Sequence, residues 1–163
     1  MSVALPIVLV GLPGAGKSKV GRLLAGRLGI PHVDTDDLIV EREGRAISDI
    51  FATDGESAFR LMETAAVADA LSHRAVVSLG GGAAATDTVR SLLVGHTVVY
   101  IDAPHDELVR RTASKTHRPD GVLRRLRSER EPHYRAVATL TVPTGPGPAE
   151  DVATAILTHL EQL

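Results

Sequence analysis

The sequence contains no cysteine among its 163 residues. Disulfides, thiolate zinc sites and cysteine nucleophiles are therefore excluded, and the composition is compatible with a reducing cytosol. Charge of one sign is not in excess either, because the formal net charge is −2. A balance so close to neutral gives no reason to expect bulk binding to nucleic acid or to an acidic membrane surface.

Long apolar runs are also missing. The first apolar stretch, residues 3–10, is much shorter than the roughly 20 residues that cross a bilayer. No basic segment precedes it and it leads directly into a glycine-rich loop, so we expect no signal peptide and a cytoplasmic protein. No internal repeat or low-complexity linker divides the chain. We therefore expect a single domain over residues 1–163, with 44% hydrophobic residues to build its core.

Apolar runs alternate with helical patterns along the chain. The runs predict buried strands at residues 4–10, 32–34, 75–79, 97–102 and 139–142. Helical periodicity fills the segments between them, and an arginine-rich helical segment over 122–138 is expected to be interrupted at Pro132. Strands separated by helices predict a five-stranded parallel sheet covered on both faces, an α/β three-layer sandwich. Ligands of such sheets bind beyond the carboxyl ends of the strands.

A phosphate-binding loop follows the first predicted strand. Gly11, Gly16, Lys17 and Ser18 match the pattern G-x-x-x-x-G-K-[ST], between a strand and a helix. Glycines let backbone N–H groups turn inward around an anion, and the helix N-terminus adds partial positive charge. Lys17 is expected to reach the β- and γ-phosphates, and the Ser18 hydroxyl is expected on Mg²⁺. The nucleotide-binding residues predicted here are Gly14, Ala15, Gly16, Lys17, Ser18 and Lys19, the last with a solvated side chain.

Two aspartates follow the second strand in the stretch "VDTDD". Asp34 and Asp36 are two residues apart and so would lie on the same side of an extended backbone. Asp34 could hold Mg²⁺ through water, and Asp36 could hold an acceptor hydroxyl and take its proton. The alternative is that Asp36 or Asp37 caps the following helix.

Two further features each allow a purely structural interpretation. The three glycines of "SLGGG" follow the third strand and suit a ligand that approaches the backbone, although a plain turn would use them too. Arg60 lies on a predicted long helix, where a surface salt bridge with Glu56 or Glu63 would also explain it.

Taken together, these motifs resemble those of shikimate kinases, which are P-loop proteins similar to nucleoside monophosphate kinases. The resemblance runs from about residue 8 to residue 138 and is carried by "GLPGAGKSKVGRLLA", "DTDDLIVEREGRAISDIFATDGESAFR", "SLGGG", "VVYID", "RRT", "RP" and "EREPHYR". It implies transfer of the γ-phosphoryl group of ATP to the 3-hydroxyl of shikimate. It also implies Mg²⁺, a monomer, a substrate-binding region over about 35–63 and a short lid over about 113–124.

The resemblance also assigns roles to individual residues. Asp36 matches the aspartate that holds the reacting hydroxyl, and Arg60 and Arg130 match the two arginines that bind the substrate carboxylate. A paired guanidinium fork suits a carboxylate. Gly81 and Gly82 correspond to the substrate-facing glycines. Arg118 of the lid is expected on the ATP phosphates, Arg111 against the adenine, and Ser18 and Asp34 around the metal, so that the catalytic residues would be Lys17, Asp36 and Arg118.

Three departures from the family pattern are present, and we expect the one at His133 to be a surface or packing change. The lid reads "RPDG" where the family usually has "RPLL", "PHY" replaces "PLY", and "TGPGP" lacks an arginine often found near the adenine. Two alternatives stay open from the sequence. One is another small-molecule kinase, such as a gluconate kinase. The other is a nucleotide-binding module that has lost catalysis.

Overall fold

The computed structural model of the protein describes residues 3–112 and 120–163. Five strands lie in this part of the chain: β1 (Ile7–Val10), β2 (His32–Asp34), β3 (Val76–Ser78), β4 (Thr97–Asp102) and β5 (Leu140–Pro143). The helices are α1 (Lys17–Leu28), α2 (Thr35–Glu43), α3 (Ile47–Asp54), α4 (Glu56–Ala70), α5 (Asp87–Leu93), α6 (His105–Thr112), α7 (Asp120–Val137) and α8 (Ala149–Leu160), with a short 3₁₀ turn, η1 (Ala83–Ala85).

The five strands form one parallel sheet in the order β2-β3-β1-β4-β5. This confirms the predicted α/β fold and its five-stranded sheet. β1 occupies the centre, and every one of its residues is buried, as expected for a strand that helices cover on both faces. The loop after β1 therefore opens at the middle of the carboxyl edge of the sheet, where ligands of this fold class bind.

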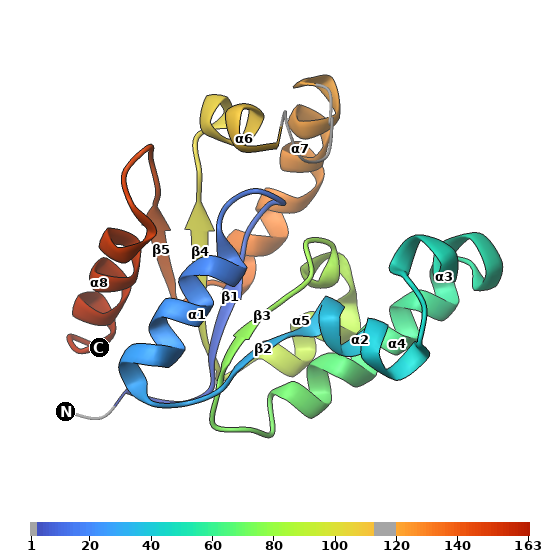
Figure 1. Ribbon diagram of the computed structural model, residues 1–163, viewed down its shortest axis with the longest axis horizontal. Coiled ribbons are helices and arrows are strands. Elements are labelled where there is room, and N and C mark those ends of the chain that lie inside the picture. The colour runs from blue at the N-terminus through green and yellow to red at the C-terminus, as the bar shows by residue number, and fades with distance from the viewer. Residues whose placement is uncertain (1–2, 113–119) are drawn as a thin grey trace.

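Helices cover the two faces of the sheet. α1 and α8 pack against each other on one face, and α7 crosses the other face behind β1 and β4 (Figure 1). Apolar side chains recur on the inner side of α1, where Val20 and Leu24 are buried, and of α8, where Ile156 and Leu160 are buried. This spacing of three to four residues gives each helix one apolar stripe for the core.

A second, smaller core lies beside β2, under the helices α2, α3 and α4. Ile39, Ile50, Phe59 and Ala66 are buried there together. These helices extend beyond the edge of the sheet (Figure 1). The small core fixes them as one unit, which places their side chains over the carboxyl ends of β2 and β3.

The expected interruption at Pro132 is wrong, because α7 runs through it without a break. Proline removes one helical N–H and usually breaks or bends a helix. Here both flanks of Pro132 are anchored to β4: Arg127 donates to Asp102 at the end of that strand, and the Tyr134 ring lies 5.3 Å from that of Tyr100. Tertiary packing thus overrides the local preference. No helix in the described part of the chain is long and apolar enough to cross a membrane.

Candidate active site

The loop between β1 and α1 has the backbone that its glycines require. Gly14 and Gly16 adopt φ angles of +86° and +101°, a region that side chains other than glycine rarely occupy. Gly16 is the N-cap residue of α1. The Lys17 Nζ donates to the carbonyl oxygens of Gly11 at 2.6 Å and Leu12 at 3.3 Å. The loop thus presents a helix N-terminus and an ammonium group at one place, the arrangement that binds phosphate.

Ser18 and Asp34 meet beside this loop. The Ser18 hydroxyl donates to Asp34 Oδ2 at 2.7 Å, while Asp34 Oδ1 accepts from the backbone N–H groups of Asp36 and Asp37. Asp34 is therefore the residue that caps α2, and the alternative in which Asp36 or Asp37 caps it is wrong. The expected extended alternation is also wrong, because β2 ends at Asp34 and Asp36 lies in the first turn of α2.

Asp36 lies in a confined environment between the loop and the glycines after β3. Burial, with added repulsion from Asp34 and Glu63, raises the pKa of Asp36 to about 6. A Cβ atom added to Gly80 would lie 2.3 Å from Asp36 Oδ1. Gly80 is thus glycine because the carboxylate occupies the space of its side chain, a role that sequence reasoning missed. A carboxylate with this pKa is suited to accept a proton near neutral pH.

Arg60 projects from α4 and is held from two sides. Its Nη1 donates to both oxygens of Glu63, at 2.9 and 3.2 Å, and its Nη2 lies 3.5 Å from Glu56. The predicted salt bridges are therefore present, and Arg60 also lines a cavity. Glu63 is only 1% exposed, and burial raises its pKa while Arg60 opposes the rise. Sequence reasoning assigned Glu63 no role beyond this pairing; in the folded chain its carboxylate also accepts from the Thr86 hydroxyl at 3.4 Å.

Arg130 reaches the same place from α7. Cβ atoms added to Gly81 and Gly82 would lie 3.0 and 3.4 Å from its guanidinium, and the one on Gly82 would also lie 3.0 Å from that of Arg60. Two cations thus converge on the glycine turn. One helical turn after Arg130, the Tyr134 hydroxyl donates to the Gly81 carbonyl oxygen at 2.5 Å, which fixes α7 against this turn.

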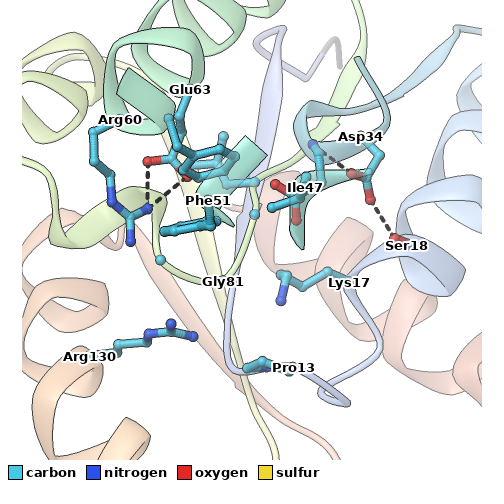
Figure 2. A pocket seen from close by; sticks show the side chains of 15 residues that line it. Pro13, Lys17, Ser18, Asp34, Ile47, Phe51, Arg60, Glu63, Gly81 and Arg130 are labelled. Atoms are coloured by element: carbon cyan, nitrogen blue, oxygen red, sulfur yellow. Dashed lines mark hydrogen bonds and ion pairs between the residues drawn. The ribbon is translucent and has the colours of Figure 1, made fainter. Parts of the chain in front are cut away.

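These side chains enclose a cavity of about 380 Å³. Figure 2 shows Arg60 and Arg130 on one side of it and Lys17 and Ser18 on the other. The polar lining comprises Lys17, Ser18, Asp34, Asp36, Arg60, Glu63 and Arg130. Apolar groups also line it, and these were not predicted: Pro13, Ile47, Phe51, Phe59 and Leu79. Ile47 and Phe51 lie four residues apart on α3, a helical spacing that could have indicated a shared face.

A second cavity, of about 600 Å³, lies on the other side of the phosphate loop. Residues Gly14, Ala15, Gly16, Lys17, Ser18, Lys19 and Arg111 all line it. Arg111 donates to the carbonyl oxygens of Gly14, Ala15 and Gly145 and to Glu107, at 2.7–3.2 Å. It thus joins α6 to the phosphate loop and to the loop after β5, with its guanidinium at the wall of this cavity. Arg118 lies outside the described residues.

The two cavities share three residues, Pro13, Lys17 and Ser18. A molecule in the first cavity and a molecule in the second would therefore meet at the start of α1. The first cavity offers two guanidinium groups, a carboxylate of raised pKa and an apolar wall, which suits a small hydroxylated acid. The second offers backbone amides and cations around a helix N-terminus, which suits a polyphosphate.

Comparison with known proteins agrees with this chemistry. The family model described as shikimate kinase matches residues 13–161. A curated shikimate kinase of Mycobacterium bovis is 48% identical over 162 residues, covering 94% of this chain and 92% of that protein. The solved shikimate kinase of Acinetobacter baumannii in complex with shikimate superposes with a TM-score of 0.90 at 36% identity, covering 98% of this chain and 94% of that one.

A gluconokinase from Sinorhizobium meliloti is a more distant structural neighbour. Its TM-score is 0.57 at 22% identity, covering 96% of this chain and 91% of that one. Likeness at this level reflects a common fold and carries no information on the acceptor.

Proposed function

The chain belongs to the shikimate kinase family, and from this premise we propose how its residues divide the reaction between the two cavities. The activity is ATP-dependent phosphorylation of the 3-hydroxyl of shikimate, which gives shikimate 3-phosphate and ADP in aromatic amino-acid biosynthesis. The observation that carries the proposal is that the two cavities share Lys17 and Ser18. In-line phosphoryl transfer requires donor and acceptor to meet head-on at one point.

The acceptor occupies the first cavity in this proposal. Arg60 and Arg130 bind the carboxylate of shikimate, since two guanidinium groups converge on Gly82. Asp36 orients the 3-hydroxyl and accepts its proton, which its raised pKa favours. Gly81 and Gly82 allow the ring to approach the backbone. Phe51 and Phe59 lie on the apolar side of the cavity.

The nucleotide occupies the second cavity, with its phosphates on the loop from Gly14 to Ser18. Lys17 neutralises charge on the transferred group, Lys19 lines the phosphate end, and Arg111 lies against the adenine. Arg118, outside the described residues, is proposed to reach the phosphates from the lid. Catalysis here depends on positioning and charge neutralisation rather than on covalent chemistry.

The donor set beside the loop fits Mg²⁺. A hydroxyl and a carboxylate oxygen lie 2.7 Å apart at Ser18 and Asp34, and Mg²⁺ prefers hard oxygen ligands with phosphate oxygens completing its shell. Ser18 would bind the ion directly and Asp34 through water. When bound, the ion supplies positive charge at the β- and γ-phosphates.

A coupled assay of ADP formation tests the function. We expect release of ADP with shikimate present and at most a slow background without it. Gluconate in place of shikimate tests the alternative kinase, because it also offers a carboxylate and hydroxyls. Turnover with gluconate alone would overturn the assignment of shikimate as substrate. ADP binding without turnover on either acid would support a nucleotide-binding module.

The activity should depend on the ionisation of Asp36. Because its pKa in the folded protein is raised to about 6, the proton-accepting form is lost as the pH falls through 6. We expect kcat/KM for shikimate, which reports the free enzyme, to fall about tenfold per unit below that pH. Initial rates between pH 5 and 8 would measure this. A profile that stays flat down to pH 5 would contradict the role of Asp36 as base.

We also propose an oligomeric state, a cellular location and a domain organisation. We infer a monomer in the cytoplasm, on the family and on the absence of cysteine from the sequence. A single kinase domain spans residues 1–163, with its substrate-binding region at about 35–63 and its lid at about 113–124. The small core shared by Ile39, Ile50 and Phe59 supports a distinct substrate-binding region.

A further inference from the structure

A polar relay lies beneath the phosphate loop, outside both cavities. His32 Nε2 lies 2.9 Å from Ser78 Oγ, and Ser78 Oγ lies 3.0 Å from the carbonyl oxygen of Lys17. Ser78 is fully buried and His32 is partly buried. Neither residue lines the acceptor cavity or the nucleotide cavity. The relay therefore connects β2 and β3 to the first residue of α1 from outside the two cavities.

The direction of the relay follows from its donors. A serine hydroxyl has one proton, and a carbonyl oxygen can only accept. Ser78 must therefore donate to the Lys17 carbonyl and accept from His32, so the His32 proton in this contact is on Nε2.

The relay ends at the backbone N–H of Ser18. The Lys17 carbonyl and the Ser18 N–H belong to one planar trans peptide and point in opposite directions. Since Gly16 is the N-cap of α1, the Ser18 N–H is among the first helical N–H groups, which have no intrahelical acceptor and face the phosphate site. A hydrogen bond to the carbonyl fixes the plane of this peptide and polarises its N–H.

β2 thus holds Ser18 at two points. His32 and Asp34 are two residues apart on β2 and so lie on the same face of the strand. Asp34 accepts directly from the Ser18 hydroxyl, whereas His32 acts on the Ser18 amide through Ser78 and the Lys17 carbonyl.

Space for the relay depends on Gly21, one turn after Lys17 in α1. A Cβ atom there would lie 2.6 Å from His32 Nε2 and 2.8 Å from Ser78 Oγ. Real side chains do not approach this closely, so alanine at this position would displace the relay while leaving both of its side chains in the protein.

We propose that His32 is a positioning residue that acts through Ser78 and the Lys17 carbonyl to aim the Ser18 N–H at a phosphate of the bound nucleotide. The proposal rests on the nucleotide role of the phosphate loop proposed above. It concerns nucleotide affinity and not the acceptor, so it can be measured without shikimate.

The first experiment compares His32→Leu with His32→Gln. Calorimetry of ADP with Mg²⁺, in the absence of shikimate, should show about tenfold weaker binding for His32→Leu, the loss expected for one hydrogen bond to a phosphate. KM for ATP should rise in parallel, while KM for shikimate should change less than about twofold. The Gln side chain also carries an N–H donor, so His32→Gln should recover most of the affinity.

The second experiment breaks the relay from α1. Gly21→Ala and Ser78→Ala should each weaken ADP binding about tenfold, and the double variant should be no weaker than the poorer single one, because both changes break the same path. Gly26→Ala is the matched control, since a Cβ on this other α1 glycine has nothing within 4 Å, and it should bind ADP like the unchanged protein.

Three results would overturn the proposal: unchanged ADP affinity in His32→Leu, no recovery in His32→Gln, or losses in Gly21→Ala and Ser78→Ala that multiply. Failure of the proposed function would give a different set of results in these measurements. In that case the unchanged protein would bind ADP but would not phosphorylate shikimate, and the relay would still be tested by the binding measurements.

Discussion

Asp36→Asn should lower kcat by about three orders of magnitude, within the range of roughly 10²–10⁴-fold expected for loss of a positioned general base. Asparagine keeps the shape of the side chain but cannot take the proton of the 3-hydroxyl. Affinity for ADP should stay within about twofold, because the nucleotide cavity does not include Asp36 and no group that contacts phosphate is removed. The coupled assay measures the first effect and calorimetry the second. Turnover near that of the unchanged protein would remove Asp36 from the mechanism.

The same substitution should make the protein more stable at pH 7.5. The pKa of Asp36 lies at about 6 in the folded protein, above its ordinary value of 3.8. A group with a raised folded pKa stabilises the fold fully below its unfolded pKa, and this contribution is lost as the pH rises through the folded pKa. Above pH 6 the ionised Asp36 therefore costs stability, by about 2–3 kcal/mol.

Asparagine does not ionise, so the gain in Tm should be present at pH 7.5 and shrink as the pH falls toward 4. Asp37→Asn is the matched control, because Asp37 is the exposed neighbour on the same turn of α2. It should leave Tm and kcat nearly unchanged. A less stable Asp36→Asn would mean that its loss of activity cannot be separated from damage to the fold.

Arg60→Ala should raise KM for shikimate about 100-fold, because a charge-assisted bidentate contact to a carboxylate contributes roughly 3 kcal/mol. It should also lower Tm, since Glu63 is buried at 1% exposure and would lose the guanidinium that pairs with it. Arg60→Lys keeps the charge but not the planar fork, and should recover Tm better than KM.

Arg130→Ala provides the comparison that separates the two effects. It should raise KM for shikimate to a similar extent, because its guanidinium converges with that of Arg60 on Gly82, but it leaves the Glu63 pairing intact and should lower Tm less. Arg42→Ala, an exposed arginine paired with Asp69 on α4, is the control away from the cavity. An unchanged KM in both Arg60→Ala and Arg130→Ala would rule out carboxylate binding by this pair.

The sequence predicts best where the signal is local. The predicted strands over 32–34 and 97–102 match the observed bounds, and the segment after the glycine loop, expected to be helical, forms α1 (Lys17–Leu28). Glycines at the loop and the apolar stripe that follows them specify α1 without help from the rest of the chain. The same holds for the parallel sheet, since alternation of strands and helices leaves few other topologies.

Predictions fail where a side-chain contact that the sequence pattern does not reveal decides the outcome. Asp36 was placed on an extended backbone, but the Asp34 side chain captures the N–H groups of residues 36 and 37 and starts α2 one residue after the strand. Gly80 could not be distinguished from a turn glycine, because only the folded chain brings Asp36 into the space of its side chain. Pro132 breaks helices in isolation, and the anchors that prevent this come from β4.

The shared wall of the two cavities has a consequence for inhibitor chemistry. Because Pro13, Lys17 and Ser18 border both, the two cavities adjoin at the start of α1. A single compound that joins an adenosine polyphosphate to a cyclohexene carboxylate would need only a bridge of phosphoryl length. Once one half is bound, the other half would bind as a tethered group at high effective concentration. Both halves would contact the phosphate loop, which lines both cavities.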